Sequence, residues 1–196
     1  IYDNFYGIFS ARLFTIMEVY GHDMNKVKIL DGGLVAWQSK GFPTTTEPTV
    51  AKKSSYKISK TNRNIVVSWD EVYRDSIFKE KPVFVLDVRP FDEFSGQKVR
   101  TTRAGFIPNA INITGSEVAN DKATHLFKNA EEIKKAFDEK NIDDSREIYV
   151  YCHSADRASH GYFVMKYLLG FKNVRVYDGS WLEWANLGAL PIQQLK

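Results

Sequence analysis

The one cysteine of the chain is the residue best placed for chemistry. Cys152 ends an apolar run at 148–151 and opens a loop of small and polar residues, CHSADR, after which apolar residues recur with helical spacing. This order predicts a buried strand, a tight loop and a helix. A thiol there meets backbone N–H groups and the positive end of a helix dipole, which favour its nucleophilic, anionic form. A lone cysteine is more often a small core residue, but the polar loop favours the reactive interpretation.

The residues that follow the cysteine form a candidate anion nest: His153, Ser154, Ala155, Asp156 and Arg157. Small residues let the backbone curl so that successive N–H groups point inward. Arg157 is expected either to hold an anion or to pair with a carboxylate such as Asp156 or Glu183. His153 either favours the thiolate electrostatically or is an exposed loop imidazole.

Four further charged residues lie near the ends of predicted elements. Asp87 and Arg89 flank the end of an apolar run at 82–88, and we expect a structural ion pair there in preference to direct catalysis. Arg100 and Arg103 precede a turn, and one of them is a candidate for reaching the mouth of the pocket, with Arg103 carried forward as a possible substrate-binding or supporting residue.

The elements that position these residues alternate between strands and helices. Strands are predicted at 65–67, 82–88, 110–114, 147–151 and 175–177, with helices at 69–78 and 131–140 between them. Such alternation predicts an α/β fold with a parallel sheet covered on both faces. Ligands bind at the carboxyl ends of parallel strands, where Asp87, Arg89 and Cys152 all lie.

The layout around Cys152 occurs twice in the chain. Residues 1–3 match 150–152 at a spacing of 149, and the string LDGGLVAW (30–37) matches YDGSWLEW (177–184) at a spacing of 147. Strands are therefore expected also at 1–2 and 27–30, with a helix at 9–20. The earlier copy has Asp3 in place of Cys152, which predicts that it is inert.

The repeat predicts the division of the chain. Residues 1–46 are interpreted as the remnant of an inactive first domain, the polar stretch 47–62 as a linker, and 63–196 as the catalytic domain. The first copy lacks the half that precedes Cys152 in the second, so a missing N-terminal segment, in cis or from another chain, is a possible partner.

Composition excludes several classes. The chain has 196 residues and a net charge of +3, which suits an anionic substrate but predicts no nucleic-acid partner. No apolar run reaches the roughly 18 residues of a membrane span and no signal peptide is visible, so we expect no membrane partner and a cytoplasmic location. The histidines show no metal-ligand spacing, and no phosphate-binding glycine loop is present.

These residues resemble a tandem-domain rhodanese of the thiosulfate/3-mercaptopyruvate sulfurtransferase family. The matching strings are LDVRPFDEFSG (86–96), RAGFIPNAINI (103–113), CHSADRASHGYFVMKYLLG (152–170), YDGSWLEW (177–184) and, in the first copy, YDNFYGIFSARLF (2–14) and LDGGLVAW (30–37). The resemblance implies a rhodanese-like parallel sheet flanked by helices, with one complete domain and the C-terminal half of an inactive first copy. In that family the first domain normally has Asp in place of Cys.

The resemblance implies a mechanism without a cofactor. Cys152 as thiolate takes the outer sulfur of thiosulfate, a small anionic donor, and passes it from a persulfide to a thiophilic acceptor such as cyanide or a thiol. Three departures bear on the donor: Ala155 replaces the usual glycine, Ser154 is closer to the mercaptopyruvate enzymes, and Glu93 stands where mammalian enzymes have an anion-binding arginine. 3-Mercaptopyruvate is therefore the alternative donor.

Two other functions compete with sulfur transfer. A cysteine phosphatase of related fold has a loop of C-x5-R, whereas Cys152 and Arg157 are spaced as C-x4-R. A non-catalytic sulfur carrier or regulatory module is the second alternative, and the cysteine retained before a helix argues against it.

Overall fold

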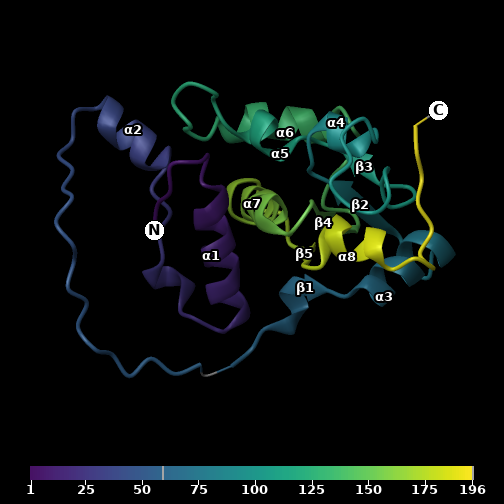
Figure 1. The fold of residues 1–196 in the computed structure, drawn as a ribbon, viewed down its shortest axis with the longest axis horizontal. Helices are drawn as coiled ribbons and strands as arrows, with labels where there is room; N and C mark the ends of the chain where they lie inside the picture. Colours follow the sequence, from purple (N-terminus) through teal and green to yellow (C-terminus); the bar gives the residue numbers. More distant parts are fainter. Residues whose placement is uncertain (59, 196) are drawn as a thin grey trace.

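A five-stranded parallel sheet forms the centre of the protein. The computed structural model describes residues 1–58 and 60–195, and its strands are ordered β1-β5-β4-β2-β3 (Figure 1). The strands are β1 (Val66–Val67), β2 (Val83–Asp87), β3 (Ile111–Asn112), β4 (Glu147–Tyr151) and β5 (Val174–Tyr177). The two longest apolar runs of the sequence thus become the adjacent central strands β2 and β4, because buried parallel strands need apolar side chains on both faces. The predicted α/β class is confirmed.

Helices cover both faces of the sheet. The helices of the described chain are α1 (Ile8–Val19), α2 (Gly33–Ser39), α3 (Trp69–Tyr73), α4 (Phe91–Phe94), α5 (Gly115–Ala119), α6 (Ala130–Asp138), α7 (Asp156–Phe163) and α8 (Ser180–Asn186). Shorter turns are η1 (Met24–Lys26), η2 (Arg63–Ile65) and the π-helical η3 (Arg74–Phe78) and η4 (Val164–Leu168), which extend α3 and α7. Residues of α5, α6 and α7 pack on one face of the sheet, and those of α3 and α8 on the other (Figure 1).

The carboxyl ends of β2 and β4 lie side by side. Asp87 pairs with Tyr151 at the end of the ladder, and the N–H of Val88 donates to the carbonyl of Tyr151 at 3.0 Å. Cys152 is the next residue along β4. The register of these two strands therefore brings the Asp87 and Cys152 segments to one edge of the sheet, as predicted.

The first 43 residues pack against α7 through α1 (Figure 1). The strands expected at 1–2 and 27–30 do not form. Their segments share only two hydrogen bonds, from the N-terminal amine of Ile1 to the carbonyl of Lys28 at 2.7 Å and from the N–H of Leu30 to the carbonyl of Ile1 at 2.9 Å. These two bonds do not continue into a ladder, because neither segment has a neighbouring strand in the sheet of the described chain.

The layout of this segment repeats that of the β4-to-α8 region in detail. The N–H of Leu34 donates to the carbonyl of Asp3 at 2.8 Å, and the N–H of Trp181 donates to that of Cys152 at 2.9 Å. Asp3 matches Cys152 at the predicted spacing of 149, and Leu34 matches Trp181 at the predicted spacing of 147. The indole N–H groups of Trp37 and Trp184 likewise donate to the carbonyl of a proline that follows each helix.

The helical stretch of the second copy, α7 with η4, is one residue longer than α1 of the first copy. α1 is preceded by Gly7 and α7 by Ala155, both in the left-handed conformation, which is a spacing of 148 instead of the expected 149. The spacing returns to 149 at Gly21 and Gly170, which have φ of 70° and 76°. The π-helical turn η4 holds the extra residue of the second copy, since such a turn accommodates one insertion within a helix.

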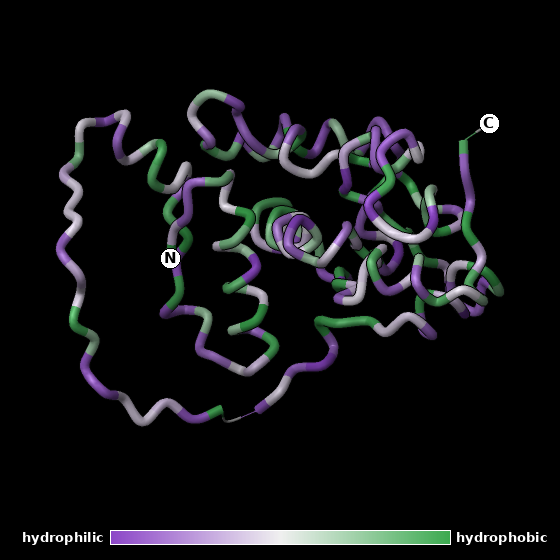
Figure 2. Tube along the Cα trace, in the orientation of Figure 1, coloured by the Kyte–Doolittle hydropathy of each residue, from purple (hydrophilic) through white to green (hydrophobic). Residues whose placement is uncertain are grey.

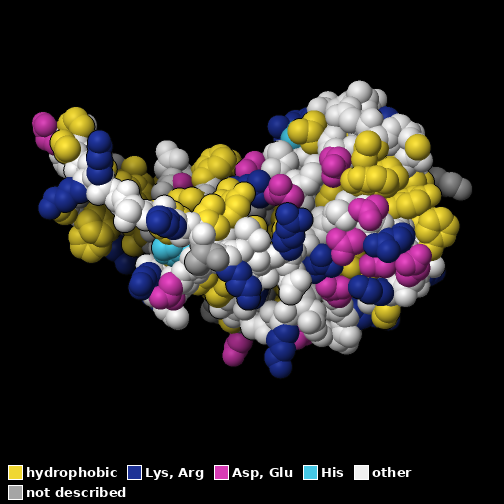
Figure 3. Space-filling view, turned by 90° about the horizontal axis from the view of Figure 1, so that it is seen from below, with side chains coloured by type: hydrophobic (Ala, Val, Ile, Leu, Met, Phe, Trp, Pro, Cys, Tyr) yellow, Lys and Arg dark blue, Asp and Glu magenta, His cyan; other side chains and the backbone are white. Residues whose placement is uncertain are grey.

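A long connection and an apolar surface complete the fold. No helix or strand lies between α2 and η2 in the described residues, and Figure 2 shows that this connection is mainly hydrophilic or neutral. The face of α1 turned away from α7 exposes Phe9, Leu13 and Ile16 by 56%, 45% and 37%. Figure 3 shows hydrophobic side chains at the surface on the left, where α1 and α2 lie. Among the described helices none is long and apolar enough to cross a membrane.

Candidate active site

Cys152 lies at the base of a loop that a buried serine anchors. The cysteine is only 1% exposed, and its N–H and that of Ala155 each donate to Oγ of Ser180 at 3.2 Å. The same hydroxyl donates to the carbonyl of Tyr177 at 2.9 Å. Ser180 therefore ties both ends of the Cys152–Ala155 turn to the end of β5. Ser180 is not among the site residues predicted from the sequence, although it lies in the YDGSWLEW string.

The predicted anion nest has free donors. Within the described chain, the backbone N–H groups of Ser154, Asp156 and Arg157 donate to no protein acceptor, and no side chain caps α7. Ala155 turns the chain into the helix with φ of 67°. A residue with Cβ in this conformation carries about 1 kcal/mol of strain, which explains why glycine suits the position. Free N–H groups at a helix N-terminus attract an anion.

The side chain of Asp156 does not enter the nest. Its carboxylate is 39% exposed, accepts the hydroxyl of Ser154 at 3.0 Å and lies 3.9 Å from Arg12 of α1. Asp156 and Ser154 therefore shape the outer side of the loop, where the first and second copies meet.

Arg157 pairs with Glu93, not with the carboxylates that the sequence suggested. Its guanidinium donates to both carboxylate oxygens of Glu93 at 3.2 and 3.0 Å. Burial lowers the pKa of Arg157, but the Glu93 hydrogen bond and the negative charge available at Cys152 together raise it above its usual value. Arg157 thus stays charged between the thiol and Glu93.

His153 does not supply a positive charge. Burial lowers its pKa, and the nearby guanidinium of Arg100 lowers it further despite the opposing effect of Glu93. Its Nδ1 is buried with no partner in the described residues. A neutral imidazole leaves Arg157 and the backbone N–H groups as the groups that can stabilise negative charge on the Cys152 sulfur.

Asp87 and Arg89 form the expected buried ion pair. Arg89 is 2% exposed and Asp87 fully buried, and the guanidinium donates to the Asp87 carboxylate at 2.6 to 3.0 Å. Arg89 also donates to the carbonyl of Gly105 at 2.8 Å and lies 4.7 Å from the ring centre of Trp181, next to the loop anchor. The pair joins the β2 end, the following loop and α8 behind the nest.

Arg103 lies away from the nest. Its guanidinium donates to three carbonyls at the C-terminal end of α8 at 2.8 to 2.9 Å, and to the carbonyl of Leu190 in the following segment at 2.7 Å. These carbonyls have no helical partners, so Arg103 caps the helix. A role at the pocket mouth is not supported for this residue. Arg100 is the arginine of the pair that comes near the site, through its bond to Glu93 at 3.2 Å.

The first copy shows its own loop occupied by a carboxylate. Asp3 accepts the N–H groups of Phe5, Gly7 and Ser10 at 2.7, 3.0 and 2.7 Å. Burial raises the pKa of Asp3, but these hydrogen bonds outweigh it and hold the pKa below its usual value. The loop that follows Asp3 therefore binds negative charge through its backbone N–H groups.

The sequence of the second copy decides the family. Residues 69–187 match the rhodanese-like domain family over more than half of the chain. The chain belongs to the rhodanese-like family. A Mycobacterium tuberculosis protein named "Putative thiosulfate sulfurtransferase" is 37% identical over 193 residues, covering 94% of this chain and 67% of that protein. "Sulfur carrier protein TtuD" of Thermus thermophilus is 35% identical over 192 residues, covering 93% of this chain and 66% of its own.

Solved structures share this rhodanese fold. A complex of EanB with ergothioneine has a TM-score of 0.84 at 25% identity, over 95% of this chain and 45% of the EanB chain. The anaerobic ergothioneine biosynthesis enzyme of Chlorobium limicola, in complex with trimethyl histidine, has a TM-score of 0.80 at 25% identity, over 99% of this chain and 49% of its own. This chain therefore spans about half the length of these structures and about two thirds of the curated relatives.

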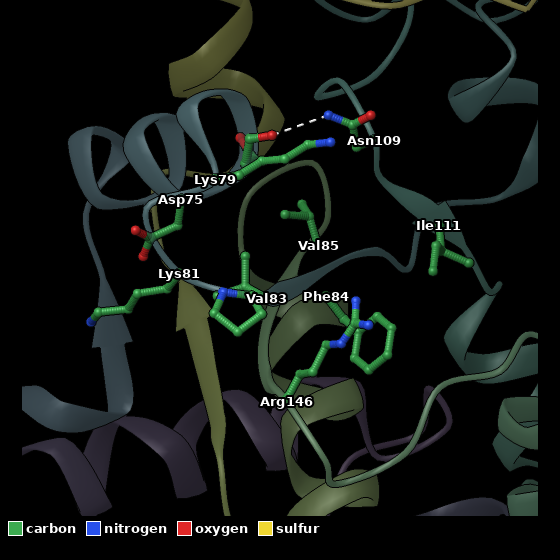
Figure 4. A pocket seen from close by; sticks show the side chains of 11 residues that line it. Asp75, Lys79, Lys81, Val83, Phe84, Val85, Asn109, Ile111 and Arg146 are labelled. Atoms are coloured by element: carbon green, nitrogen blue, oxygen red, sulfur yellow. Dashed lines mark hydrogen bonds between the residues drawn. The ribbon is translucent and has the colours of Figure 1, made fainter.

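A separate hollow lies at the opposite end of the rhodanese sheet. It has a volume of about 470 Å³, and Figure 4 shows Lys79, Lys81 and Arg146 around it, with Arg146 beside the ring of Phe84. These residues lie before the amino ends of β2 and β4 or in their first residues. None of the candidate site residues lines this hollow, so it is distinct from the Cys152 site. No group of His, Cys, Asp or Glu in the described residues is arranged to hold a metal ion.

Proposed function

We propose that this rhodanese-family sulfurtransferase moves the sulfane sulfur of thiosulfate to a thiophilic acceptor through a persulfide on Cys152. The observation that carries the proposal is the position of the thiol. It lies at the base of a nest with free N–H groups, next to the charged Arg157 and beside His153, whose lowered pKa keeps its imidazole neutral. Such a site stabilises negative charge on sulfur before and after transfer.

The reaction needs no proton transfer at the sulfur. The Cys152 thiolate attacks the outer sulfur of thiosulfate, a new S–S bond forms, the original S–S bond breaks, and sulfite leaves with that electron pair. The persulfide keeps one negative charge, which the nest accommodates. Cyanide or a thiolate then attacks the outer sulfur and releases the Cys152 thiolate. The neutral His153 is consistent with this balance, since no step requires an acid.

Mass spectrometry of the intact protein tests the persulfide directly. After treatment with thiosulfate, we expect an added mass of about 32 Da on Cys152 that cyanide removes as thiocyanate. Cys152→Ala is expected to fold and to show neither the adduct nor thiocyanate formation. Equal thiocyanate formation by this variant would refute the assignment.

The same experiment separates the alternatives. 3-Mercaptopyruvate in place of thiosulfate produces the same adduct, so the ratio of kcat/KM for the two donors identifies the preferred one. A sulfur carrier, as the TtuD relative is named, would form the adduct and yield it to a protein thiol faster than to cyanide. Hydrolysis of an aryl phosphate faster than thiocyanate formation would favour a phosphatase.

The hydrogen bonds shared by the two copies support a further proposal about the domains. We propose that residues 1–46 are the second half of an inactive rhodanese copy, 47–62 a linker, and 63–196 the catalytic domain. The Asp3 carboxylate occupies its own nest and offers no sulfur nucleophile, whereas the free thiol of Cys152 does.

A further inference from the structure

Three charged side chains from separate segments form a linked pair of salt bridges near Cys152. Glu93 on α4 is 4% exposed and binds both Arg157 of α7, which is 20% exposed, and Arg100 of the following loop, which is 46% exposed. Burial raises the pKa of Glu93, but its bonds to the two arginines hold the pKa below the usual value. The carboxylate is therefore ionised when the enzyme works.

The sum of these charges fits poorly with a doubly charged donor. Two arginines and one glutamate leave one net positive charge, because His153 is neutral. In the proposed reaction the sulfur of Cys152 carries one negative charge, as the attacking thiolate or as the persulfide, and this charge balances the positive one. A thiosulfate dianion then adds two negative charges that none of these three side chains balances, whereas a monoanionic donor adds one.

We propose that Glu93 is a specificity-determining residue that weakens the binding of doubly charged anions more than that of singly charged ones. This inference rests on the proposed sulfur transfer, since it concerns the charge of the donor. Glu93 acts through the field at the nest and through its hold on Arg157, and it does not touch the reacting sulfur. The same repulsion speeds the departure of sulfite, which the cleavage of the S–S bond releases as a dianion.

The size of the effect depends on donor charge in a simple way. If removing one negative charge raises the affinity for a monoanion by a factor f, it raises that for a dianion by f squared. Over roughly 7 Å in a partly exposed site, a unit charge alters affinity for another by about threefold to tenfold. We therefore expect at least about tenfold for a dianion with about threefold for a monoanion.

The test is Glu93→Gln, which keeps the size of the side chain and an oxygen that accepts from Arg157. We expect the KM for thiosulfate to fall about tenfold, the KM for 3-mercaptopyruvate about threefold, and product inhibition by sulfite to strengthen about tenfold. Glu147→Gln is the matched control. Glu147 also pairs with an arginine, Arg175 at 3.7 Å, but begins the strand that ends before Cys152, roughly 16 Å away. Its KM values should not change.

A binding measurement separates this inference from the proposed function. Calorimetry of thiosulfate binding to Cys152→Ala, with and without Glu93→Gln, needs no turnover, and the second substitution should tighten binding about tenfold. Unaltered protein that forms no persulfide with any donor would refute the sulfur transfer and leave this charge effect standing. Equal changes for both donors, or a loss of kcat at constant KM, would show that Glu93 only positions Arg157 and would overturn the inference.

Discussion

The hydroxyl of Ser180 provides the sharpest test of how the loop is held. Ser180→Ala keeps the backbone and Cβ and removes only the atom that accepts from the N–H groups of Cys152 and Ala155. Both donors are buried, and each buried donor left without a partner costs about 1–3 kcal/mol. We expect the free energy of unfolding to fall by about 3 kcal/mol, which lowers Tm by roughly 6–12 °C in a protein of this size.

Activity should fall together with stability. The loop N–H groups are expected to bind the transferred sulfur, and a misplacement near 1 Å costs up to about a hundredfold in rate. Urea denaturation and the rate of adduct formation with thiosulfate, followed by mass spectrometry, measure the two effects. We expect the adduct to form about tenfold more slowly or worse.

Ser76→Ala is the control for the loss of a buried hydroxyl. Ser76 is 4% exposed, and its hydroxyl has no hydrogen-bond partner in the described residues. Removing it should change stability by less than about 1 kcal/mol and leave the rate alone. If the Ser180 and Ser76 variants lose equal stability and form the adduct at equal rates, the hydroxyl of Ser180 does not anchor the loop.

Two further predictions concern residues outside the nest. Arg103→Ala removes the cap of α8 and should lower the free energy of unfolding, measured in urea, by about 3 kcal/mol while the KM for thiosulfate stays constant. A raised KM at unchanged stability would show instead that Arg103 contributes to substrate binding. Burial of His160 lowers its pKa from 6.5 to about 4, so the folded state binds fewer protons than the unfolded state between these values. The contribution of His160 to the free energy of unfolding is therefore fully present above pH 6.5 and should fall by about 3 kcal/mol as the pH drops to 4. A His160→Phe variant whose free energy of unfolding depends on pH with the same slope would contradict this.

The sequence predicts the scaffold well, because burial leaves a pattern in it. The continuous apolar runs at 82–88 and 147–151 become the central strands, and the polar loop after the second run becomes the site. The run at 27–30 looks similar but forms no strand, because a strand also needs a neighbour with which to pair. Periodicity reports which residues avoid water and does not report whether a partner strand is present.

Side-chain partners in loops are less predictable. The sequence leaves Arg157 either to hold an anion or to pair with a carboxylate such as Asp156 or Glu183. Its partner in the structure is Glu93, which is 64 residues away. Glu183 instead accepts the hydroxyl of Tyr177 at 2.8 Å. The periodicity of helices and strands does not predict such a pair, because the paths of the loops decide which charged side chains come together.

The role of Ser180 could have been predicted from the repeat. It corresponds to Gly33 in the first copy, and both have φ of 53°. A serine that replaces a glycine at a left-handed position accepts strain, which indicates that its hydroxyl has a purpose there. Comparison of the two copies residue by residue would have selected it.

The carboxylate of Asp3 has a consequence for the chemistry of the other loop. From Cα, an aspartate extends through Cβ and Cγ to Oδ, and a cysteine persulfide extends through Cβ and Sγ to a terminal sulfur, so their tips are the same number of bonds away. In the first loop, three N–H groups donate to the carboxylate of Asp3, so this loop always holds a negative charge. In the proposed reaction, the second loop gains a persulfide and loses it again once per turnover. The protein thus contains a fixed replica of the intermediate that we propose, and a Cys152→Asp variant would hold a carboxylate in both loops.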